Sequence, residues 1–165
     1  MGCGLVCLIM KTQCQAHVED STAASLNHEP PPVYLILVVD DDPDIRQLLT
    51  DMLTRFGYIV ATAGDGEAAW RAMAAVSFNL LITDHSMPKV TGVELIRKLR
   101  EAGRIVPVIM ATGTIPKDEF ERDPSLKPAA IITKPFTKAE LLKTVVDVLG
   151  ATYGVRGPGD RSEVD

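Results

Sequence analysis

The stretch that decides the fold is residues 80–88, which read Leu-Leu-Ile-Thr-Asp-His-Ser-Met-Pro. The apolar run at its start, Leu80-Leu81-Ile82, shows no polar alternation and therefore suits a strand covered on both faces, as in a parallel sheet. A carboxylate, Asp84, follows this run closely. We therefore expect Asp84 at the carboxyl end of a buried strand, the edge where open α/β sheets bind ligands.

Three other short apolar runs also end in a polar side chain. They are residues 35–39, followed by Asp40-Asp41-Asp42, residues 106–111, followed by Thr112, and residues 130–133, followed by Lys134. If these runs are parallel strands of one sheet, the acids, the hydroxyl and the ammonium meet at the same edge. Oxygen ligands suit Mg²⁺, and an ammonium suits a phosphoryl oxygen. The pattern therefore favours a site for a divalent cation and a phosphoryl group.

Segments with helical character alternate with these runs. Apolar spacing and capping signals predict helices at residues 43–56, 67–76, 92–102 and 138–149, a short or irregular fourth helix at residues 117–122, and a further strand at residues 58–63. Five strands alternating with five helices indicate an α/β fold with a doubly wound, five-stranded parallel sheet. Right-handed crossovers leave few strand orders. One of them, 2-1-3-4-5, places the first and third strands side by side, but periodicity alone does not select it.

The chain of 165 residues is long enough for one domain with a buried core. We expect this domain at residues 34–150, between a disordered N-terminal extension at residues 1–33 and a disordered C-terminal tail at residues 151–165. The formal charge of −5 gives no reason to expect a nucleic-acid surface. No stretch reaches the roughly 18 apolar residues that span a bilayer. We therefore expect a cytoplasmic protein that binds neither nucleic acid nor membrane.

Four short motifs resemble the receiver domain of bacterial two-component response regulators. They are Leu-Val-Val-Asp-Asp at residues 37–41, Thr-Asp-His-Ser-Met-Pro at residues 83–88, Ala-Thr-Gly at residues 111–113 and Lys-Pro-Phe at residues 134–136. Their order and spacing together are specific, and the resemblance covers residues 34–149. It implies a flavodoxin-like receiver fold of the chemotaxis-regulator type, with strand order 2-1-3-4-5. The residues after 149 are too few for an output domain, so a stand-alone receiver is expected.

The resemblance also implies roles for individual side chains. Asp84 would accept a phosphoryl group from a histidine kinase or a phosphotransfer protein. Thr112 would be the switch hydroxyl. Lys134 would bind the phosphoryl group, and its peptide bond to Pro135 is often cis in this family. The chemistry is reasonable, because a carboxylate in line with the donor phosphorus is a competent nucleophile.

A Mg²⁺ cofactor is implied by the same resemblance. Asp41 and Asp84 would supply carboxylate oxygens, Ser86 would supply its backbone carbonyl, and Asp40 would order a metal-bound water. Asp42 is expected to cap the following helix instead. Clustered acids repel one another, so the site is expected to need a cation.

Phosphorylation is expected to switch binding to an unknown downstream protein and, as a hypothesis, to promote a homodimer. The protein would catalyse only its own phosphorylation and dephosphorylation, and would not be an enzyme acting on a separate substrate. Ile131 stands where receivers often carry Tyr or Phe, and prolines interrupt the fourth helix. We therefore expect the coupling to partners to use other side chains than usual.

Two alternatives share part of this pattern. A phosphatase of the haloacid dehalogenase type also carries Asp-x-Asp after its first strand, so Asp40 would be the nucleophile and Asp42 the acid/base. Pro43 and Asp44 depart from that family, and Asp84 would have no role in it. The second alternative is a receiver-shaped scaffold that takes no phosphate. The intact set of acids, hydroxyl and lysine argues against it.

Overall fold

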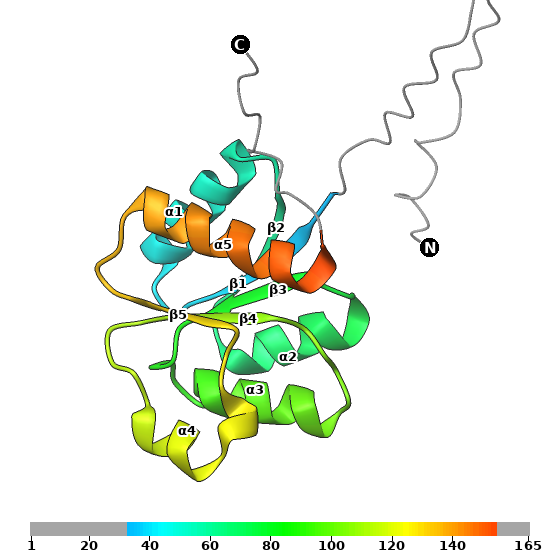
Figure 1. The fold of residues 1–165 in the computed structure, drawn as a ribbon, viewed down its shortest axis with the longest axis vertical. Helices are drawn as coiled ribbons and strands as arrows, with labels where there is room; N and C mark the ends of the chain where they lie inside the picture. Colours follow the sequence, from blue (N-terminus) through cyan, green and yellow to red (C-terminus); the bar gives the residue numbers. More distant parts are fainter. Residues whose placement is uncertain (1–32, 155–165) are drawn as a thin grey trace, which may run out of the picture. The chain divides into compact units, whose positions relative to one another are not determined.

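The computed structural model describes residues 33–154, and the segments 1–32 and 155–165 of the two predicted disordered ends lie outside this range. Within it, strands alternate with helices along the chain (Figure 1). The strands are β1 (Leu35–Val39), β2 (Ile59–Ala63), β3 (Leu80–Thr83), β4 (Val108–Thr112) and β5 (Ala130–Thr133). The helices are α1 (Pro43–Arg55), α2 (Gly66–Ala75), α3 (Gly92–Glu101), α4 (Lys117–Arg122), the 3₁₀ helix η1 (Pro124–Leu126) and α5 (Lys138–Tyr153).

The five strands form one parallel sheet in the order β2-β1-β3-β4-β5. This confirms the predicted α/β fold and selects the order that periodicity leaves open. The register of β1 and β3 pairs Val39 with Thr83, the last residues of the two strands. Asp40 and Asp84 follow this pair directly and are therefore neighbours at the carboxyl edge. Lys134 follows β5 at the same edge.

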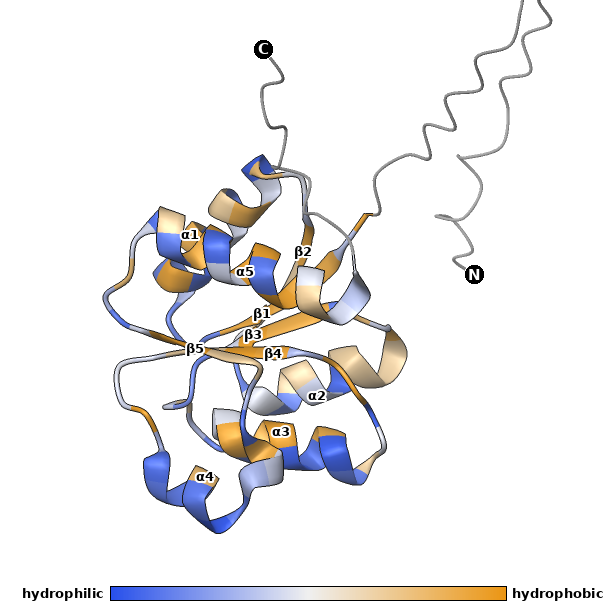
Figure 2. Cartoon of the chain, in the orientation of Figure 1, coloured by the Kyte–Doolittle hydropathy of each residue, from blue (hydrophilic) through white to orange (hydrophobic). Residues whose placement is uncertain are grey.

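Helices cover both faces of the sheet, with α1 and α5 on one side and α2, α3 and α4 on the other (Figure 1). Successive residues of a strand point to opposite faces. Ile36 and Val38 of β1 therefore join the core beneath α1 and α5, whereas Leu37 and Val39 join the core beneath α2 and α3. The strands are mostly apolar, whereas the helices mix hydrophilic and hydrophobic residues (Figure 2). The three central strands β1, β3 and β4 are almost entirely buried. Burial on both faces explains why these three strands lack polar alternation.

The end of α5 corrects the sequence prediction. The sequence predicts that the helix ends at residue 149 and that a disordered tail begins at residue 151, whereas the helix continues through Gly150 to Tyr153. A glycine inside a helix costs only about 1 kcal/mol. The ring centroids of Tyr153 and Tyr34 lie 5.7 Å apart, and the Tyr153 hydroxyl donates to the carbonyl of Asn79 at 3.0 Å. Gly154, with φ 69°, then caps the helix.

The start of β4 is also corrected. The strand begins at Val108 instead of residue 106, because its pairing with β3 begins where Val108 lies opposite Leu81. Pro107 has no N–H to donate and stays outside the strand, although its carbonyl accepts from the Leu81 N–H. Thr112 belongs to the strand instead of following it.

The predicted short fourth helix is confirmed. α4 has six residues, and Pro116 before it provides no side-chain cap. A second short turn, η1, follows directly. No helix among residues 33–154 is long and apolar enough to cross a membrane.

Candidate functional site

Two aspartates lie side by side at the carboxyl edge of the sheet. Asp40 is 2% exposed and Asp84 is 7% exposed, so both carboxylates are taken largely out of water. The sheet itself holds their backbones, because the Asp84 N–H donates to the carbonyl of Val39 at 2.9 Å. Two buried acids this close need a compensating charge.

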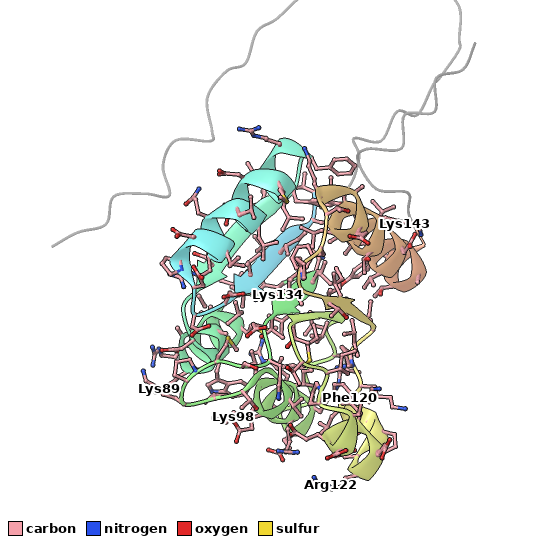
Figure 3. The ribbon with its side chains drawn as sticks, turned by 90° about the vertical axis from the view of Figure 1, so that its left-hand side faces the viewer. Lys89, Lys98, Phe120, Arg122, Lys134 and Lys143 are labelled. Atoms are coloured by element: carbon pink, nitrogen blue, oxygen red, sulfur yellow. The ribbon has the colours of Figure 1, made fainter. Side chains whose placement is uncertain are left out.

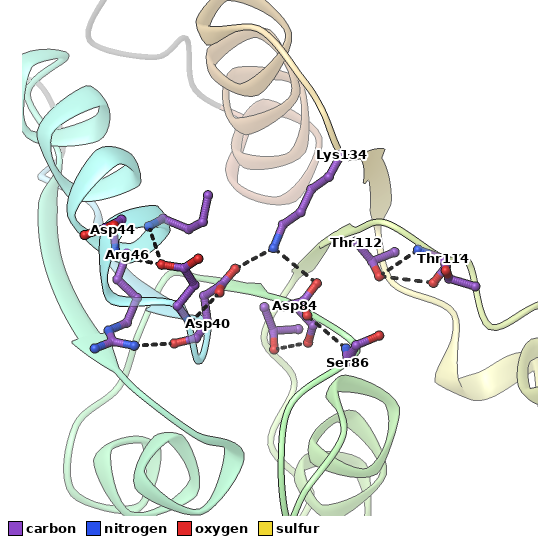
Figure 4. A network of polar contacts seen from close by, with 11 residues as sticks. Asp40, Asp44, Arg46, Asp84, Ser86, Thr112, Thr114 and Lys134 are labelled. Atoms are coloured by element: carbon purple, nitrogen blue, oxygen red, sulfur yellow. Dashed lines mark hydrogen bonds and ion pairs between the residues drawn. The ribbon is translucent and has the colours of Figure 1, made fainter.

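Lys134 supplies that charge. Its Nζ lies 2.6 Å from Asp40 Oδ2 and 3.4 Å from Asp84 Oδ1 (Figure 4). In Figure 3 Lys134 lies near the middle of the molecule, whereas Lys89 and Lys143 lie toward its periphery. The Lys134–Pro135 peptide bond is cis, as the resemblance predicts.

The same contacts control the charge on Lys134. Burial alone would lower the pKa of its ammonium, but the hydrogen bond and charge of Asp40, with the charge of Asp84, outweigh burial. The net effect raises the pKa of Lys134 above its usual value. The ammonium therefore stays charged at neutral pH and links the two carboxylates.

The other oxygen of each carboxylate accepts a backbone hydrogen bond. Asp84 Oδ2 accepts from the Ser86 N–H at 2.9 Å, and Asp40 Oδ1 accepts from the Asp42 N–H at 3.0 Å. These local bonds fix the rotation of both side chains. Asp84 therefore presents Oδ1 toward Lys134, with Oδ2 held at the start of the following loop.

Asp41 and Asp42 lie on the outer side of this pair. Both side chains are exposed. Asp42 is the N-cap of α1, because its side chain accepts from the N–H groups of Asp44 and Ile45. This confirms the predicted cap. It also gives Asp42 a structural task in place of the acid/base task that the phosphatase alternative requires.

Thr112 is buried but does not bond to either aspartate in this structure. Its Oγ1 donates to the carbonyl of Thr114 at 3.0 Å and accepts from the Thr114 N–H at 3.3 Å. The hydroxyl thus holds the start of the loop after β4. A switch that uses Thr112 must exchange these two bonds for new ones.

The donor atoms at this edge suit Mg²⁺ in chemical type. Asp40 and Asp84 place carboxylates there, Ser86 lies in the adjoining turn, and Asp41 follows Asp40 directly. Among residues 33–154, no three His, Cys, Asp or Glu side chains converge closely enough to hold a metal ion by themselves. Such a cage is not required, because Mg²⁺ usually binds through one or two carboxylates and keeps several waters. The residues therefore fit a partly hydrated Mg²⁺.

The sequence motifs do not single out Arg46 or Gly92, which also lie near the site. Arg46 donates from Nη1 to the backbone carbonyl of Asp40 at 2.7 Å. Gly92 lies against the backbone of Asp84. Both contacts are with backbone atoms, which motif spacing does not reveal. His85 follows Asp84 directly, and a lone histidine in a loop is expected to be solvated; its side chain is instead only 16% exposed, with Nε2 3.7 Å from Glu119 Oε1 of α4.

A family model, the response regulator receiver domain, matches residues 36–146. The chain belongs to this family. The receiver is 36% identical over 116 residues to the alkaline phosphatase synthesis transcriptional regulatory protein PhoP of Bacillus subtilis. The match covers 69% of this chain and 48% of PhoP. The chain thus spans about half the length of PhoP, and 12% to 15% of three other curated relatives.

Solved receiver structures agree with the fold. The chemotaxis protein CheY4 of Vibrio cholerae is 30% identical to this receiver, with a TM-score of 0.66, covering 71% of this chain and 99% of CheY4. The response regulator TrrA of Thermotoga maritima, solved in complex with Mg(2+)-BeF, is 31% identical to this receiver, with a TM-score of 0.62. The match covers 70% of this chain and 99% of TrrA. Membership in this family leaves the haloacid dehalogenase alternative without support.

Proposed function

We propose that this receiver accepts a phosphoryl group on Asp84 from a histidine kinase or a phosphotransfer protein, with Mg²⁺ as cofactor, and thereby changes its binding to a partner. The observation that carries the proposal is the Lys134 ammonium, which contacts Asp40 at 2.6 Å and Asp84 at 3.4 Å. A fixed cation beside a buried carboxylate suits the stabilisation of an incoming phosphoryl group.

The geometry favours Oδ1 of Asp84 as the attacking atom. Oδ2 already accepts from the Ser86 N–H, whereas Oδ1 faces Lys134. Attack through Oδ1 forms an O–P bond as the P–N bond to the donor histidine breaks. The imidazole leaves with the electron pair of that bond and takes a proton. The acyl phosphate then presents negative oxygens to Lys134.

The acids around Asp84 would hold the cation that we propose for this transfer. Asp41, Asp84 and the Ser86 carbonyl would bind Mg²⁺, and Asp40 would orient a water beside it. When bound, Mg²⁺ supplies positive charge to the phosphoryl oxygens. Asp40 also keeps its hydrogen bond to Lys134, which holds the ammonium close to Asp84.

Thr112 provides the switch in this proposal. Within the described part of the chain, its hydroxyl bonds to the backbone of Thr114 alone. A phosphoryl oxygen near Asp84 offers a stronger, charged acceptor. Transfer of the Thr112 hydroxyl bond to this oxygen would release the Thr114 backbone and move the loop that leads into α4.

The wider function follows from the same switch. We propose a cytoplasmic protein that catalyses only its own phosphorylation and dephosphorylation and is not an enzyme for a separate substrate. Its partners are a phosphodonor protein and a downstream protein, and its phosphorylated form is expected to dimerise. Sedimentation velocity with and without beryllofluoride checks the last point, and an unchanged sedimentation coefficient would contradict dimerisation.

The deciding experiment is intact mass spectrometry after incubation with acetyl phosphate and Mg²⁺. We expect one added phosphoryl group, which is absent in Asp84→Asn and in protein treated with a chelator. An adduct that persists in Asp84→Asn would place the acceptor elsewhere. If no adduct forms, beryllofluoride binding separates a receiver that requires its protein donor from a scaffold that takes no phosphate.

A further inference from the structure

Arg46 lies at the start of α1, next to the acidic turn, and reaches back to the end of β1. Its Nη1 donates to the backbone carbonyl of Asp40 at 2.7 Å (Figure 4). Its own backbone N–H donates to the carbonyl of Asp42 at 3.1 Å. The side chain and the backbone of one residue thus hold both ends of the segment from Asp40 to Asp42.

The guanidinium also contacts the loop that follows β2. A Cβ built on Gly64 would lie 3.5 Å from Arg46 Nη1 and 3.7 Å from Cζ, so the guanidinium packs directly on this glycine. The neighbouring Ala63 carbonyl accepts from the Asp40 N–H at 3.4 Å. Arg46 therefore fastens the acidic turn to the β2 side of the site.

Arg46 has no carboxylate partner within the described residues 33–154. None of the ion pairs among residues 33–154 includes it, although Asp40, Asp41, Asp42 and Asp44 all lie close to it in the chain. An arginine used for charge alone would be expected to pair with one of these acids. Arg46 donates instead to the main-chain carbonyl of Asp40, which indicates a role in fixing the backbone of the turn.

We propose that Arg46 is a positioning residue for the Mg²⁺ site: it holds the Asp40–Asp42 turn so that the carboxylates of Asp40 and Asp41 are presented toward Asp84. This inference rests on the proposed function. Arg46 makes no hydrogen bond or ion pair with Asp84 or Lys134, so in this proposal it acts through the turn. It is therefore distinct from the side chains that contact the phosphoryl group.

The direction in which Mg²⁺ affinity changes on mutation distinguishes a positioning role of Arg46 from a purely electrostatic role. Arg46→Gln removes a positive charge beside several acids, which by Coulomb attraction alone would make Mg²⁺ bind more tightly. Loss of the turn would make Mg²⁺ bind more weakly, because groups that orient metal ligands commonly contribute about tenfold or more in affinity. The two effects act in opposite directions.

The test is isothermal titration of the full chain with Mg²⁺, in the absence of any phosphodonor. We expect Arg46→Gln to raise the dissociation constant for Mg²⁺ by about tenfold, and Arg46→Lys to restore part of the loss. Arg55→Gln is the matched control, since it removes the same charge from the exposed last turn of the same helix. It should leave Mg²⁺ binding unchanged.

A second readout does not depend on the metal. Amide hydrogen exchange at Asp42, whose N–H donates to Asp40 Oδ1, should be faster in metal-free Arg46→Gln than in wild type or Arg55→Gln. Tighter Mg²⁺ binding or unchanged Asp42 exchange would overturn the inference. If the wild type binds no Mg²⁺, the proposed function fails while the exchange experiment still decides the role of Arg46. If Arg46→Gln does not fold, Arg46→Lys is compared with wild type by the same two measurements.

Discussion

Gly92 and Asp84 approach each other so closely that no side chain fits between them. A Cβ built on Gly92 would overlap the carbonyl oxygen of Asp84 and would lie 3.0 Å from Cα of His85. The Gly92 N–H also donates to the His85 carbonyl at 3.0 Å. The first residue of α3 therefore sets the position of the backbone that carries Asp84, the proposed phosphoacceptor.

Gly92→Ala should consequently damage both stability and phosphorylation. The methyl group must push against backbone, which cannot rotate away as a side chain can. We expect a loss of about 1–3 kcal/mol in the free energy of unfolding, typical of overpacking. Urea unfolding measures this loss, and the rate of adduct formation with acetyl phosphate should fall as Asp84 is displaced.

Gly113→Ala is the control for the stability part. An added Cβ at Gly113 meets no atom within 4 Å. Its unfolding midpoint should stay close to that of the wild type. A Gly92→Ala protein with wild-type stability and wild-type phosphorylation would show that the loop adjusts without cost.

Lys134→Met should destabilise the metal-free protein, because it leaves Asp40 and Asp84 buried without a cation. The expected loss is about 1–3 kcal/mol at pH 7, the penalty for a buried polar group without its partner. Lys143→Met is the matched control, because Lys143 pairs with Asp147 on the exposed surface of α5 at 2.6 Å. Exposed pairs contribute little, so this variant should unfold like the wild type.

The difference in the free energy of unfolding between the wild type and Lys134→Met should also depend on pH. Since the pKa of Lys134 is raised in the folded protein, its ion pairs stabilise fully below the usual value of 10.5. That stabilisation is lost as the pH rises through the folded value. Urea unfolding at neutral and alkaline pH should show that the free energies of unfolding of the two proteins converge only above pH 10.5. Convergence at neutral pH would contradict the assigned ion pairs.

Thr112→Val should separate phosphorylation from switching. Valine keeps the buried shape but removes both hydrogen bonds to Thr114, at a cost of about 0.5–1.5 kcal/mol. Asp84 should still accept a phosphoryl group. Amide exchange at Thr114 should respond to beryllofluoride in the wild type and in Thr112→Ser, which keeps the hydroxyl. A full response in Thr112→Val would exclude the hydroxyl as the switch.

The sequence predicts the placement of Asp40, Asp84 and Lys134 well because each follows a short apolar run. In a parallel sheet buried on both faces, such runs end at one edge, so position along the chain translates directly into position in space. The β1–β3 register then adds what periodicity lacks, namely that the two acids are immediate neighbours.

Other features depend on contacts that leave no local signal. Arg46 bonds to a backbone carbonyl, which every residue carries, so its partner has no signature in the sequence. The extent of α5 was missed because Gly150 reads as a stop, whereas Tyr153 is held by Tyr34 and Asn79 from elsewhere in the chain. Tertiary packing outweighs the helix-ending preference of glycine there.

Tyr58 gives a final prediction, at the opposite edge of the sheet from Asp84. Tyr58 is 2% exposed, and its hydroxyl has no hydrogen-bond partner in the described part of the chain. Burial raises the pKa of Tyr58 to about 12, with a smaller contribution from Tyr34. Between the usual value of 10 and about 12, the unfolded chain loses this proton while the folded protein keeps it. Stability should therefore fall as the pH rises through this range.

Tyr58→Phe removes both the unpaired hydroxyl and this titration. We expect the variant to be at least as stable as the wild type at pH 7, since no hydrogen bond of Tyr58 is lost. It should also lose less stability than the wild type between pH 10 and 12. Tyr153→Phe is the contrasting variant, because its hydroxyl donates to Asn79 at 3.0 Å and its removal should cost about 0.5–1.5 kcal/mol. Urea unfolding of both variants across this pH range decides the matter: a Tyr58→Phe protein that is clearly destabilised at pH 7 would mean that the hydroxyl does have a partner, such as a buried water.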